Sequence, residues 1–295
     1  MDLAGIFPPL PTPFIDDEIA VDKLKMNIDK LNNTNLSGYV VMGSNGESVY
    51  LSMKEKIELV SKVKEYASGN KKIIAGTGLE SIKDTIKLTN EAADAGADCS
   101  LILTPSYYKS KMTHNAFVEY FYNVADEVKI PVLIYNVPKF TGVDIETGTV
   151  AKLADHKNII GIKNSSENIA QLAEIIYSTP DDFITLVGTA SVIFSGMSIG
   201  AKGAIAALAN IAPYECLKIF DLFNSGKIDE SLSLQFKMLA LNKAVTAKYG
   251  VPGLKKAMDL LGYFGGNPRK PLPILNEIET QDLKNILASA DILTV

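Results

Sequence analysis

The chain has 295 residues, of which 47% are hydrophobic and 21% charged, and its formal net charge at pH 7 is −5. This composition is typical of a globular protein with a sizeable core and argues against a disordered chain. Lys and Arg cluster only in short pairs such as Lys71-Lys72 and Lys255-Lys256, so we expect binding neither to nucleic acid nor to anionic membranes.

The cysteine content and the first residues indicate a cellular compartment. Cys99 and Cys216 lie in or beside apolar stretches far apart in the sequence, which favours free core thiols in a reducing compartment. The beginning of the chain lacks the basic region and apolar run of a signal peptide. No later run reaches the roughly 18 apolar residues of a membrane-spanning helix. We predict a cytoplasmic protein.

Short apolar runs alternate with longer amphipathic runs along most of the chain. The short runs predict eight strands, at residues 5–10, 38–43, 71–76, 99–104, 131–136, 159–164, 184–188 and 203–208. The amphipathic runs predict helices at residues 23–32, 52–67, 81–96, 113–128, 146–156, 168–178 and 191–201. Glu55 follows three residues after Ser52, which is the pattern of a capping box at a helix start.

The order of these elements predicts the fold. Continuous rather than alternating apolar strands indicate burial on both faces, as in a parallel sheet covered by helices. Eight βα units without a G-x-G-x-x-G after the first strand favour a (β/α)₈ TIM barrel over a doubly wound sheet. We predict an α/β barrel over residues 1–225 and a C-terminal helical region over 226–295, with helices at 232–250 and 252–263.

Lys163 is the first candidate for chemistry, because it lies near the end of an apolar strand, "IIGIKN". Active sites of such barrels lie at the C-terminal ends of the strands. An amine held among apolar residues keeps a larger neutral fraction and can attack a ketone to form a Schiff base. The alternative is a strand-end lysine that reaches solvent or pairs with an acid. Tyr135 closes the preceding strand at the same depth and could transfer a proton, or could simply pack.

Loops after other strands supply further candidates. "GSNGES" (43–48) places Ser44 and Asn45 in a glycine loop whose amides could hold a carboxylate, or which could be a plain turn. Ser165 follows Lys163 by two residues and would point the same way. The remaining candidates are weak alone: Tyr107 and Tyr108 in "TPSYYKSKM", and Gly188 in "GTAS" (188–191).

A metal site is not predicted. His114 and His156 lie in helical contexts without ligand spacing, and no Cys pair is present. No Walker loop is present either. We therefore expect a mechanism without a metal or another cofactor.

Four motifs together resemble one enzyme family along nearly the whole chain. They are "GSNGES", the "YNVP…TG" after the fifth strand, the "GIK" of the sixth and "GAIAALAN" at the eighth. The chain is similar in these motifs to the dihydrodipicolinate synthase and N-acetylneuraminate lyase superfamily of class I aldolases. The resemblance implies a TIM barrel with a C-terminal helical part, a homotetramer, and a lysine Schiff base with pyruvate or another 2-oxo acid.

The resemblance also implies roles for individual residues. Lys163 would form the Schiff base and Tyr135 would be the proton donor and acceptor. Ser44 and Asn45 would bind the substrate carboxylate, with Ser44 also a relay, and Ile205 would line the pyruvate pocket through its backbone. A relay tyrosine from a neighbouring subunit would be either Tyr107 or Tyr108.

Departures from the family pattern bear on the substrate. Dihydrodipicolinate synthases usually carry an arginine in "YNVPxRTG" that meets the semialdehyde, whereas this chain has Phe140 there. N-acetylneuraminate lyases place acidic residues after the seventh strand, and "GTAS" has none. The chain looks most like 4-hydroxy-2-oxoglutarate aldolases, which release pyruvate and glyoxylate. The alternatives are 4-hydroxy-tetrahydrodipicolinate synthase, a 2-keto-3-deoxy sugar acid aldolase, N-acetylneuraminate lyase and a non-enzymatic ketoacid sensor.

Overall fold

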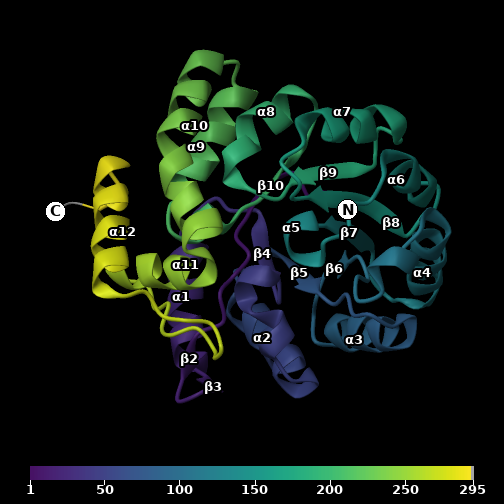
Figure 1. The fold of residues 1–295 in the computed structure, drawn as a ribbon, viewed down its shortest axis with the longest axis horizontal. Helices are drawn as coiled ribbons and strands as arrows, with labels where there is room; N and C mark the ends of the chain where they lie inside the picture. Colours follow the sequence, from purple (N-terminus) through teal and green to yellow (C-terminus); the bar gives the residue numbers. More distant parts are fainter. Residues whose placement is uncertain (294–295) are drawn as a thin grey trace.

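A computed structural model describes residues 1–293 of the chain. Eight parallel strands form one sheet in the order β1-β10-β9-β8-β7-β6-β5-β4. They are β1 (Gly5–Phe7), β4 (Gly38–Val41), β5 (Lys72–Gly76), β6 (Cys99–Leu103), β7 (Val132–Asn136), β8 (Ile159–Asn164), β9 (Ile184–Val187) and β10 (Gly203–Ile205). All eight predicted strands are present, and they lie at the centre of a ring of helices (Figure 1).

The sheet curls until its two edge strands meet. Pro9 and Val40 form a parallel bridge between the segment after β1 and β4. The Leu10 amide donates to Val40 O at 2.9 Å, and the Val40 amide donates to Pro8 O at 3.0 Å. Strand β1 is shorter than predicted because Pro8 and Pro9 have no amide hydrogen to continue the ladder. The predicted TIM barrel is confirmed.

Helices follow the strands and cover the outside of the barrel. They are α1 (Val21–Asn32), α2 (Met53–Tyr66), α3 (Ile82–Asp94), α4 (His114–Glu127), α6 (Thr147–Leu153), α7 (Ile169–Ser178) and α8 (Ile193–Ser198), with a short α5 (Pro138–Thr141) after β7. Ser52 and Glu55 form the predicted capping box at the start of α2. At the starts of α2, α3, α4 and α7 the N-cap side chain accepts a hydrogen bond from an amide of the first turn, which favours a helix start there.

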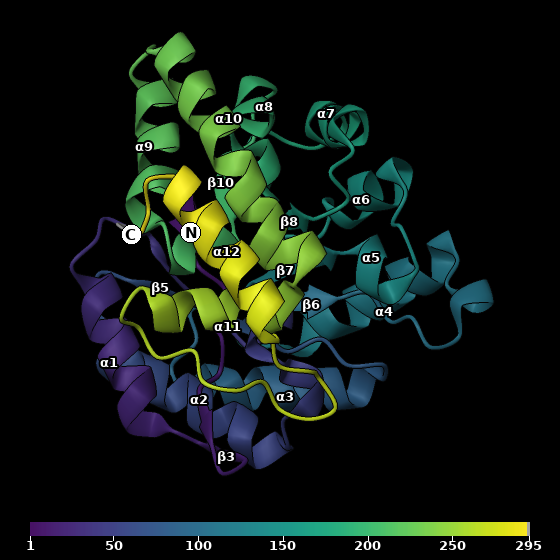
Figure 2. The ribbon, with the colours of Figure 1, turned by 60° about the vertical axis from the view of Figure 1, so that its left-hand side comes forward.

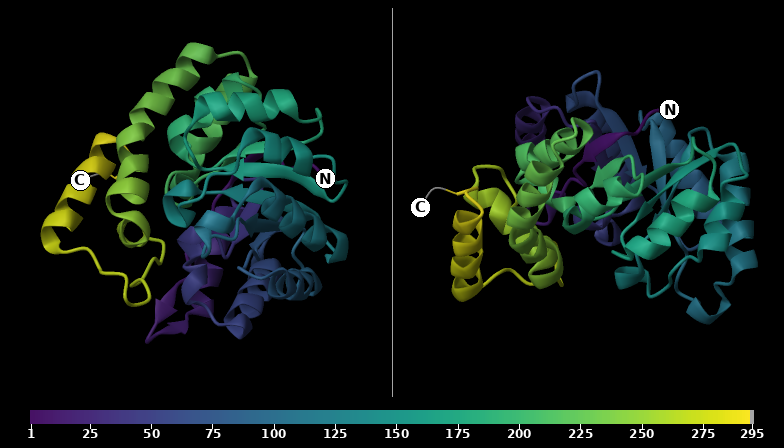
Figure 3. Two further views of the ribbon diagram at one scale, coloured as in Figure 1. Left: turned by 45° about the vertical axis from the view of Figure 1, so that its right-hand side comes forward. Right: turned by 90° about the horizontal axis from the view of Figure 1, so that it is seen from above.

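Four longer helices end the described chain: α9 (Pro213–Asn224), α10 (Ile228–Lys243), α11 (Gly250–Leu260) and α12 (Glu277–Ser289). They gather on one side of the barrel, with α12 lying over α10 and α11 (Figure 2). Two further views show the same arrangement (Figure 3). The predicted helix 232–250 is interrupted, because Ala244–Lys248 form a π-helical turn. The sequence patterns did not predict α9, α12 or the small hairpin β2 (Phe14–Ile15) and β3 (Glu18–Ile19).

Apolar side chains fill the inside of the barrel as well as the layer between strands and helices. The interior cluster draws one or two residues from most strands: Leu3, Phe7, Val40, Ile74, Cys99, Leu101, Leu133, Tyr135, Val137, Leu186 and Ile205. Both cysteines are free and buried, as predicted. Because the interior is packed, the substrate pocket of such a barrel is expected at the C-terminal ends of the strands.

Candidate active site

Lys163 and Tyr135 lie side by side at the C-terminal ends of β8 and β7. The two residues are register partners in the parallel ladder. Lys163 Nζ lies 3.9 Å from the centre of the Tyr135 ring. Both side chains are buried, with 3% of Lys163 and 6% of Tyr135 exposed. The two residues are 28 positions apart in the sequence. They meet in the structure because neighbouring parallel strands end at the same edge of the sheet.

The loop after β4, residues 43–48, reaches the same point. Residues Ser44–Gly46 form a 3₁₀ turn, which turns the Ser44 side chain toward β7. Ser44 Oγ lies 3.3 Å from the Tyr135 hydroxyl oxygen, a hydrogen bond in which either hydroxyl can donate. We call residues 43–48 the β4 loop.

These contacts change the acidity of the phenol. Burial opposes ionisation of Tyr135, because it removes water from the phenolate. The adjacent ammonium of Lys163 and the hydrogen bond from Ser44 favour the phenolate and together hold the pKa of Tyr135 below its ordinary value. A phenol with a lowered pKa gives up and recovers a proton more readily, which suits general acid–base chemistry.

A pocket of about 110 Å³ opens above these residues. Its walls include six predicted site residues: Ser44, Asn45, Tyr135, Lys163, Ser165 and Gly188. Ser165 Oγ is a buried oxygen with no hydrogen-bond partner among the described residues, so it offers a polar position to a bound molecule. A Cβ on Gly188 would meet that oxygen at 1.7 Å, so only glycine fits there.

The other predicted site residues lie outside the pocket of this single chain. Ile205 is fully buried in the barrel interior, and Ala207 lines the pocket in its place. Tyr107 and Tyr108 are 76% and 70% exposed and pack edge to face with ring centres 5.1 Å apart. The Tyr107 amide and the Ser106 amide both donate to the Glu80 carboxylate, which holds this exposed loop. Asn164 turns away from the pocket toward Asn136 and Gln171.

Several further residues line the pocket, and apart from Phe140 the sequence patterns did not name them as site residues. Lys139, Phe140 and Glu167 line the outer part of the pocket and are exposed. Glu167 has a φ of 60°, a backbone conformation that residues other than glycine rarely adopt. The π-helical turn and the start of α11 supply the facing wall with Val245, Thr246, Ala247, Gly250 and Val251. A π-helical turn cannot be read from apolar periodicity, although such turns recur at functional sites.

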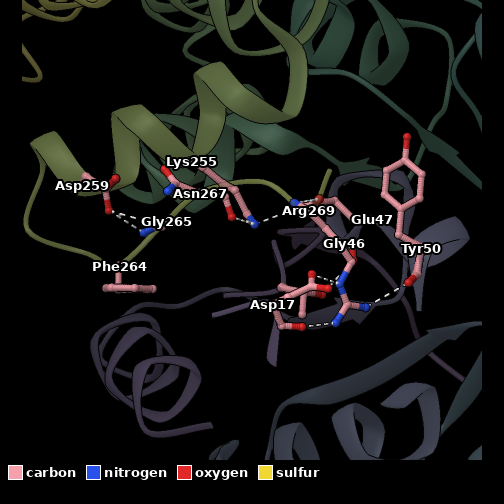
Figure 4. Close-up of polar contacts among 12 residues, drawn as sticks. Asp17, Gly46, Glu47, Tyr50, Lys255, Asp259, Phe264, Gly265, Asn267 and Arg269 are labelled. Carbon is pink, nitrogen blue, oxygen red and sulfur yellow. Dashed lines mark hydrogen bonds and ion pairs between the residues drawn. The ribbon is translucent and has the colours of Figure 1, made fainter. Parts of the chain in front are cut away.

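A cluster of charges beneath the β4 loop was also missed. Glu47, the residue after the 3₁₀ turn, contacts Lys255 of α11 and the Arg269 amide (Figure 4). The only sequence feature that pointed to this cluster was the glutamate within "GSNGES". A charged residue in a glycine loop is usually read as exposed, which is why periodicity gave no sign of burial.

The described residues show neither a cluster that fits a metal ion nor a membrane span. No group of three or more His, Cys, Asp or Glu side chains in residues 1–293 could hold a metal. Over the same residues, each helix is too short or too polar to cross a bilayer.

Comparison with known proteins identifies the family. The model of the dihydrodipicolinate synthetase family matches residues 2–290. The chain belongs to the dihydrodipicolinate synthetase family. The 4-hydroxy-tetrahydrodipicolinate synthase of Methanoculleus marisnigri is 34% identical, with 97% of this chain and 98% of that protein covered.

Solved structures of the family agree with this assignment. The dihydrodipicolinate synthase of Aquifex aeolicus superposes with a TM-score of 0.93 at 29% identity, covering 98% of this chain and 99% of that one. A prophage protein of the family from E. coli K12, solved in complex with pyruvate, superposes with a TM-score of 0.93 at 28% identity, covering 99% of each chain.

Membership of the dihydrodipicolinate synthetase family confirms the superfamily resemblance and the prediction of a lyase of the class I aldolase type. The finer prediction, a 4-hydroxy-2-oxoglutarate aldolase, is not supported by the names of these relatives. They carry the name of the first predicted alternative, 4-hydroxy-tetrahydrodipicolinate synthase.

Proposed function

We propose that Lys163 forms a Schiff base with pyruvate and that the resulting enamine reacts with an aldehyde in the outer pocket. The observation that carries the proposal is the environment of the Lys163 amine. It is buried at the pocket floor against the Tyr135 ring, and no described carboxylate lies within 4.0 Å of it. A buried amine without an acidic partner is poorly explained by stability and suits a nucleophile.

The chemistry balances with groups that the pocket supplies. The neutral amine of Lys163 attacks the C2 ketone of pyruvate, and loss of water gives the iminium. Transfer of a proton from C3 to the Tyr135 phenolate gives the enamine, because the iminium nitrogen accepts the electron pair of the broken C–H bond. C3 then attacks the aldehyde carbon, which restores the iminium, and the new alkoxide takes the proton of the Tyr135 hydroxyl. Attack on the iminium carbon by water, or by an amino group of the product, then breaks the bond to Lys163 and releases the product and the free amine. In the cleavage direction the same steps run in reverse.

Ser44 and Asn45 are the residues that we assign to the pyruvate carboxylate. Both line the pocket from the β4 loop, and Ser44 Oγ also lies within hydrogen-bond distance of the Tyr135 hydroxyl. Ser44 could thus hold the carboxylate and return a proton to Tyr135 after each turnover. Ser165, with its unpartnered Oγ, is the further polar group for the bound 2-oxo acid.

For the aldehyde we propose aspartate semialdehyde, which makes the enzyme a 4-hydroxy-tetrahydrodipicolinate synthase. Lys139 and Glu167 place one cation and one anion in the outer pocket. An amino acid head group carries a carboxylate and an ammonium, so this pair of charges is complementary to it. The name shared by the relatives supports the same reaction.

Cleavage of 4-hydroxy-2-oxoglutarate is the second candidate, and Phe140 favours it. The side chain is 63% exposed at the pocket mouth, where the family pattern carries an arginine for the semialdehyde. Glyoxylate has a carboxylate but no ammonium, so Lys139 would attract it whereas Glu167 would find no cation on it to bind. The Glu167→Gln variant separates the candidates, since it should weaken use of aspartate semialdehyde at least tenfold and leave 4-hydroxy-2-oxoglutarate cleavage unchanged or faster.

The relay tyrosine belongs, in this proposal, to a second copy of the chain in a homotetramer. Tyr107 and Tyr108 are exposed on a loop that does not line the pocket of their own chain. Exposed paired aromatics of this kind suit an interface. Tyr107→Phe and Tyr108→Phe should differ in turnover, with only the relay residue slowing it, and sedimentation should report a tetramer for both.

Trapping with borohydride tests the Schiff base directly. Borohydride added with pyruvate should leave a reduced adduct on the peptide that contains Lys163, measured as a mass increase. The same treatment of Lys163→Met should leave no adduct. An adduct on another lysine, or none on the parent protein, would contradict the proposal. Product assays with aspartate semialdehyde, 4-hydroxy-2-oxoglutarate, 2-keto-3-deoxy sugar acids and N-acetylneuraminate then separate a synthase, an aldolase and a sensor that binds without turnover.

A further inference from the structure

A buried ion pair joins the β4 loop to α11. Lys255 Nζ is 2.5 Å from Glu47 Oε1, and the two side chains are 0% and 1% exposed. Lys255 also donates to the Asn267 carbonyl at 3.1 Å, and its ammonium lies 4.6 Å from the centre of the Phe14 ring. Burial lowers the pKa of Lys255 and the Glu47 carboxylate opposes that shift.

Arg269 adds a second connection to the same carboxylate. Its backbone amide donates to Glu47 Oε2 at 2.7 Å. Its guanidinium donates to Glu55 Oε1 of α2 at 2.6 Å and to the Tyr50 carbonyl at 2.9 Å. Figure 4 shows Arg269 between Glu47, Tyr50 and Asp17, so both oxygens of Glu47 are held from the C-terminal part of the chain. We call Glu47, Lys255 and Arg269 the anchor cluster.

The backbone of Glu47 ties this cluster to the pocket. Glu47 has a φ of 56°, and its amide donates to the Ser44 carbonyl at 3.2 Å. The Tyr50 amide donates to the Glu47 carbonyl at 2.9 Å. A left-handed residue that is not glycine costs free energy and persists only where its surroundings hold it. Any shift of Glu47 would therefore move the 3₁₀ turn that carries Ser44 and Asn45.

The other end of the ion pair lies on a helix whose first residues line the pocket. Lys255 lies on α11, whose first residues Gly250 and Val251 line the pocket. The pair thus joins the β4 loop to α11, two of the segments that line the pocket. Apolar residues of similar volume often match or exceed the stability of a buried ion pair, so stability alone does not account for this one.

We propose that the anchor cluster consists of positioning residues, which hold Ser44 and Asn45 where the carboxylate of the 2-oxo acid binds and where Ser44 meets Tyr135. The part that concerns pyruvate rests on the proposed function. None of the three residues lines the pocket, so they act through the β4 loop and not on the substrate.

The test uses Glu47→Gln and the double variant Glu47→Gln with Lys255→Met, in the full chain. The double variant removes both charges together, so it avoids leaving one buried charge alone. Lys71→Met is the matched control. Lys71 is also buried, and its Nζ donates to the Thr34 and Leu36 carbonyls at 2.6 and 2.7 Å. It precedes β5, at the opposite end of the barrel from the pocket.

The first measurement needs no substrate. Hydrogen exchange of residues 43–50 should be at least about tenfold faster in both Glu47 variants and unchanged in Lys71→Met, because loss of a charge-assisted hydrogen bond frees the loop. The second measurement is kinetic. KM for pyruvate should rise about tenfold or more, whereas the amount of reduced adduct on Lys163 at saturating pyruvate should equal that of the parent protein.

Two results would overturn the proposal. One is exchange of residues 43–50 at the parent rate in the double variant. The other is the same rise in KM in Lys71→Met, which would make the effect a general loss of stability. If the parent protein forms no pyruvate adduct, the proposed function fails, and the exchange measurement still decides whether the anchor cluster holds the loop.

Discussion

Two buried lysines, Lys163 and Lys255, resemble one another closely in their surroundings and differ in one respect. Each amine lies over an aromatic ring, Lys163 at 3.9 Å from Tyr135 and Lys255 at 4.6 Å from Phe14. The side chains are 3% and 0% exposed. Lys255 has a carboxylate 2.5 Å away in Glu47, whereas Lys163 has none within 4.0 Å among the described residues.

This difference separates a structural amine from a reactive one. A carboxylate partner keeps an ammonium charged in a buried site and fixes its position. No described carboxylate holds the Lys163 amine, so it is available to a bound substrate. The burial of a lysine therefore does not by itself indicate chemistry. The position of the Lys163 amine at the pocket floor against Tyr135, together with the lack of an acidic partner, does.

The largest effect should come from removing the Lys163 amine. Lys163→Met should lower turnover at least about 10⁵-fold, since the covalent step has no other nucleophile. Its free energy of unfolding should be equal to or above that of the parent protein, because an amine without an acidic partner is replaced by an apolar chain. Urea unfolding and a product assay measure both quantities. A clear loss of stability would show that Lys163 has a structural role like that of Lys255.

Removing only the phenol hydroxyl should have a smaller effect on rate. Tyr135→Phe keeps the ring against the amine and should lower kcat by about 10²–10⁴. Borohydride should still trap the adduct on Lys163, because iminium formation does not depend on the later proton transfer to the aldehyde oxygen. Kinetics and mass measurement on one preparation test both points. A variant with the parent kcat would remove Tyr135 from the mechanism.

Lys255→Met should lower the free energy of unfolding, which Lys163→Met should leave equal or raise. It leaves the buried carboxylate of Glu47 without its ammonium partner, so the free energy of unfolding should fall by about 3–5 kcal/mol. Most of that loss should return in the double variant with Glu47→Gln. Urea unfolding of the single and double variants provides the measurement. Equal stability of the two would show that the two charges do not interact.

The smallest expected effect is a change in how the free energy of unfolding depends on pH in the acidic range. The hydrogen bond from Arg269 is the main cause that lowers the pKa of Glu55 to about 2, from an ordinary value near 4.5. Below about pH 4.5 the unfolded chain binds a proton that the folded chain does not, so stability falls as the pH drops toward 2. Glu55→Gln should therefore lose less stability than the parent between pH 5 and 3, in urea unfolding at each pH. Equal losses would remove Glu55 from the acid response.

The sequence was informative about Lys163 and Tyr135 because strand length and order fixed their depth. Both lie near the ends of apolar strands, and neighbouring parallel strands end together. It was uninformative about Glu167 and Val245, which reach the pocket through a left-handed residue and a π-helical turn. Neither conformation leaves a periodic pattern of apolar residues.

The sequence by itself determined the barrel, its eight strands and the pairing of Lys163 with Tyr135, because these follow from local apolar periodicity and the regular geometry of parallel sheets. Only the tertiary structure decided that Glu47 is buried and that Lys255 and Arg269 hold it across more than 200 positions of sequence. Such contacts depend on where the C-terminal helices pack against the barrel. A local sequence pattern does not predict contacts between residues so far apart in the chain.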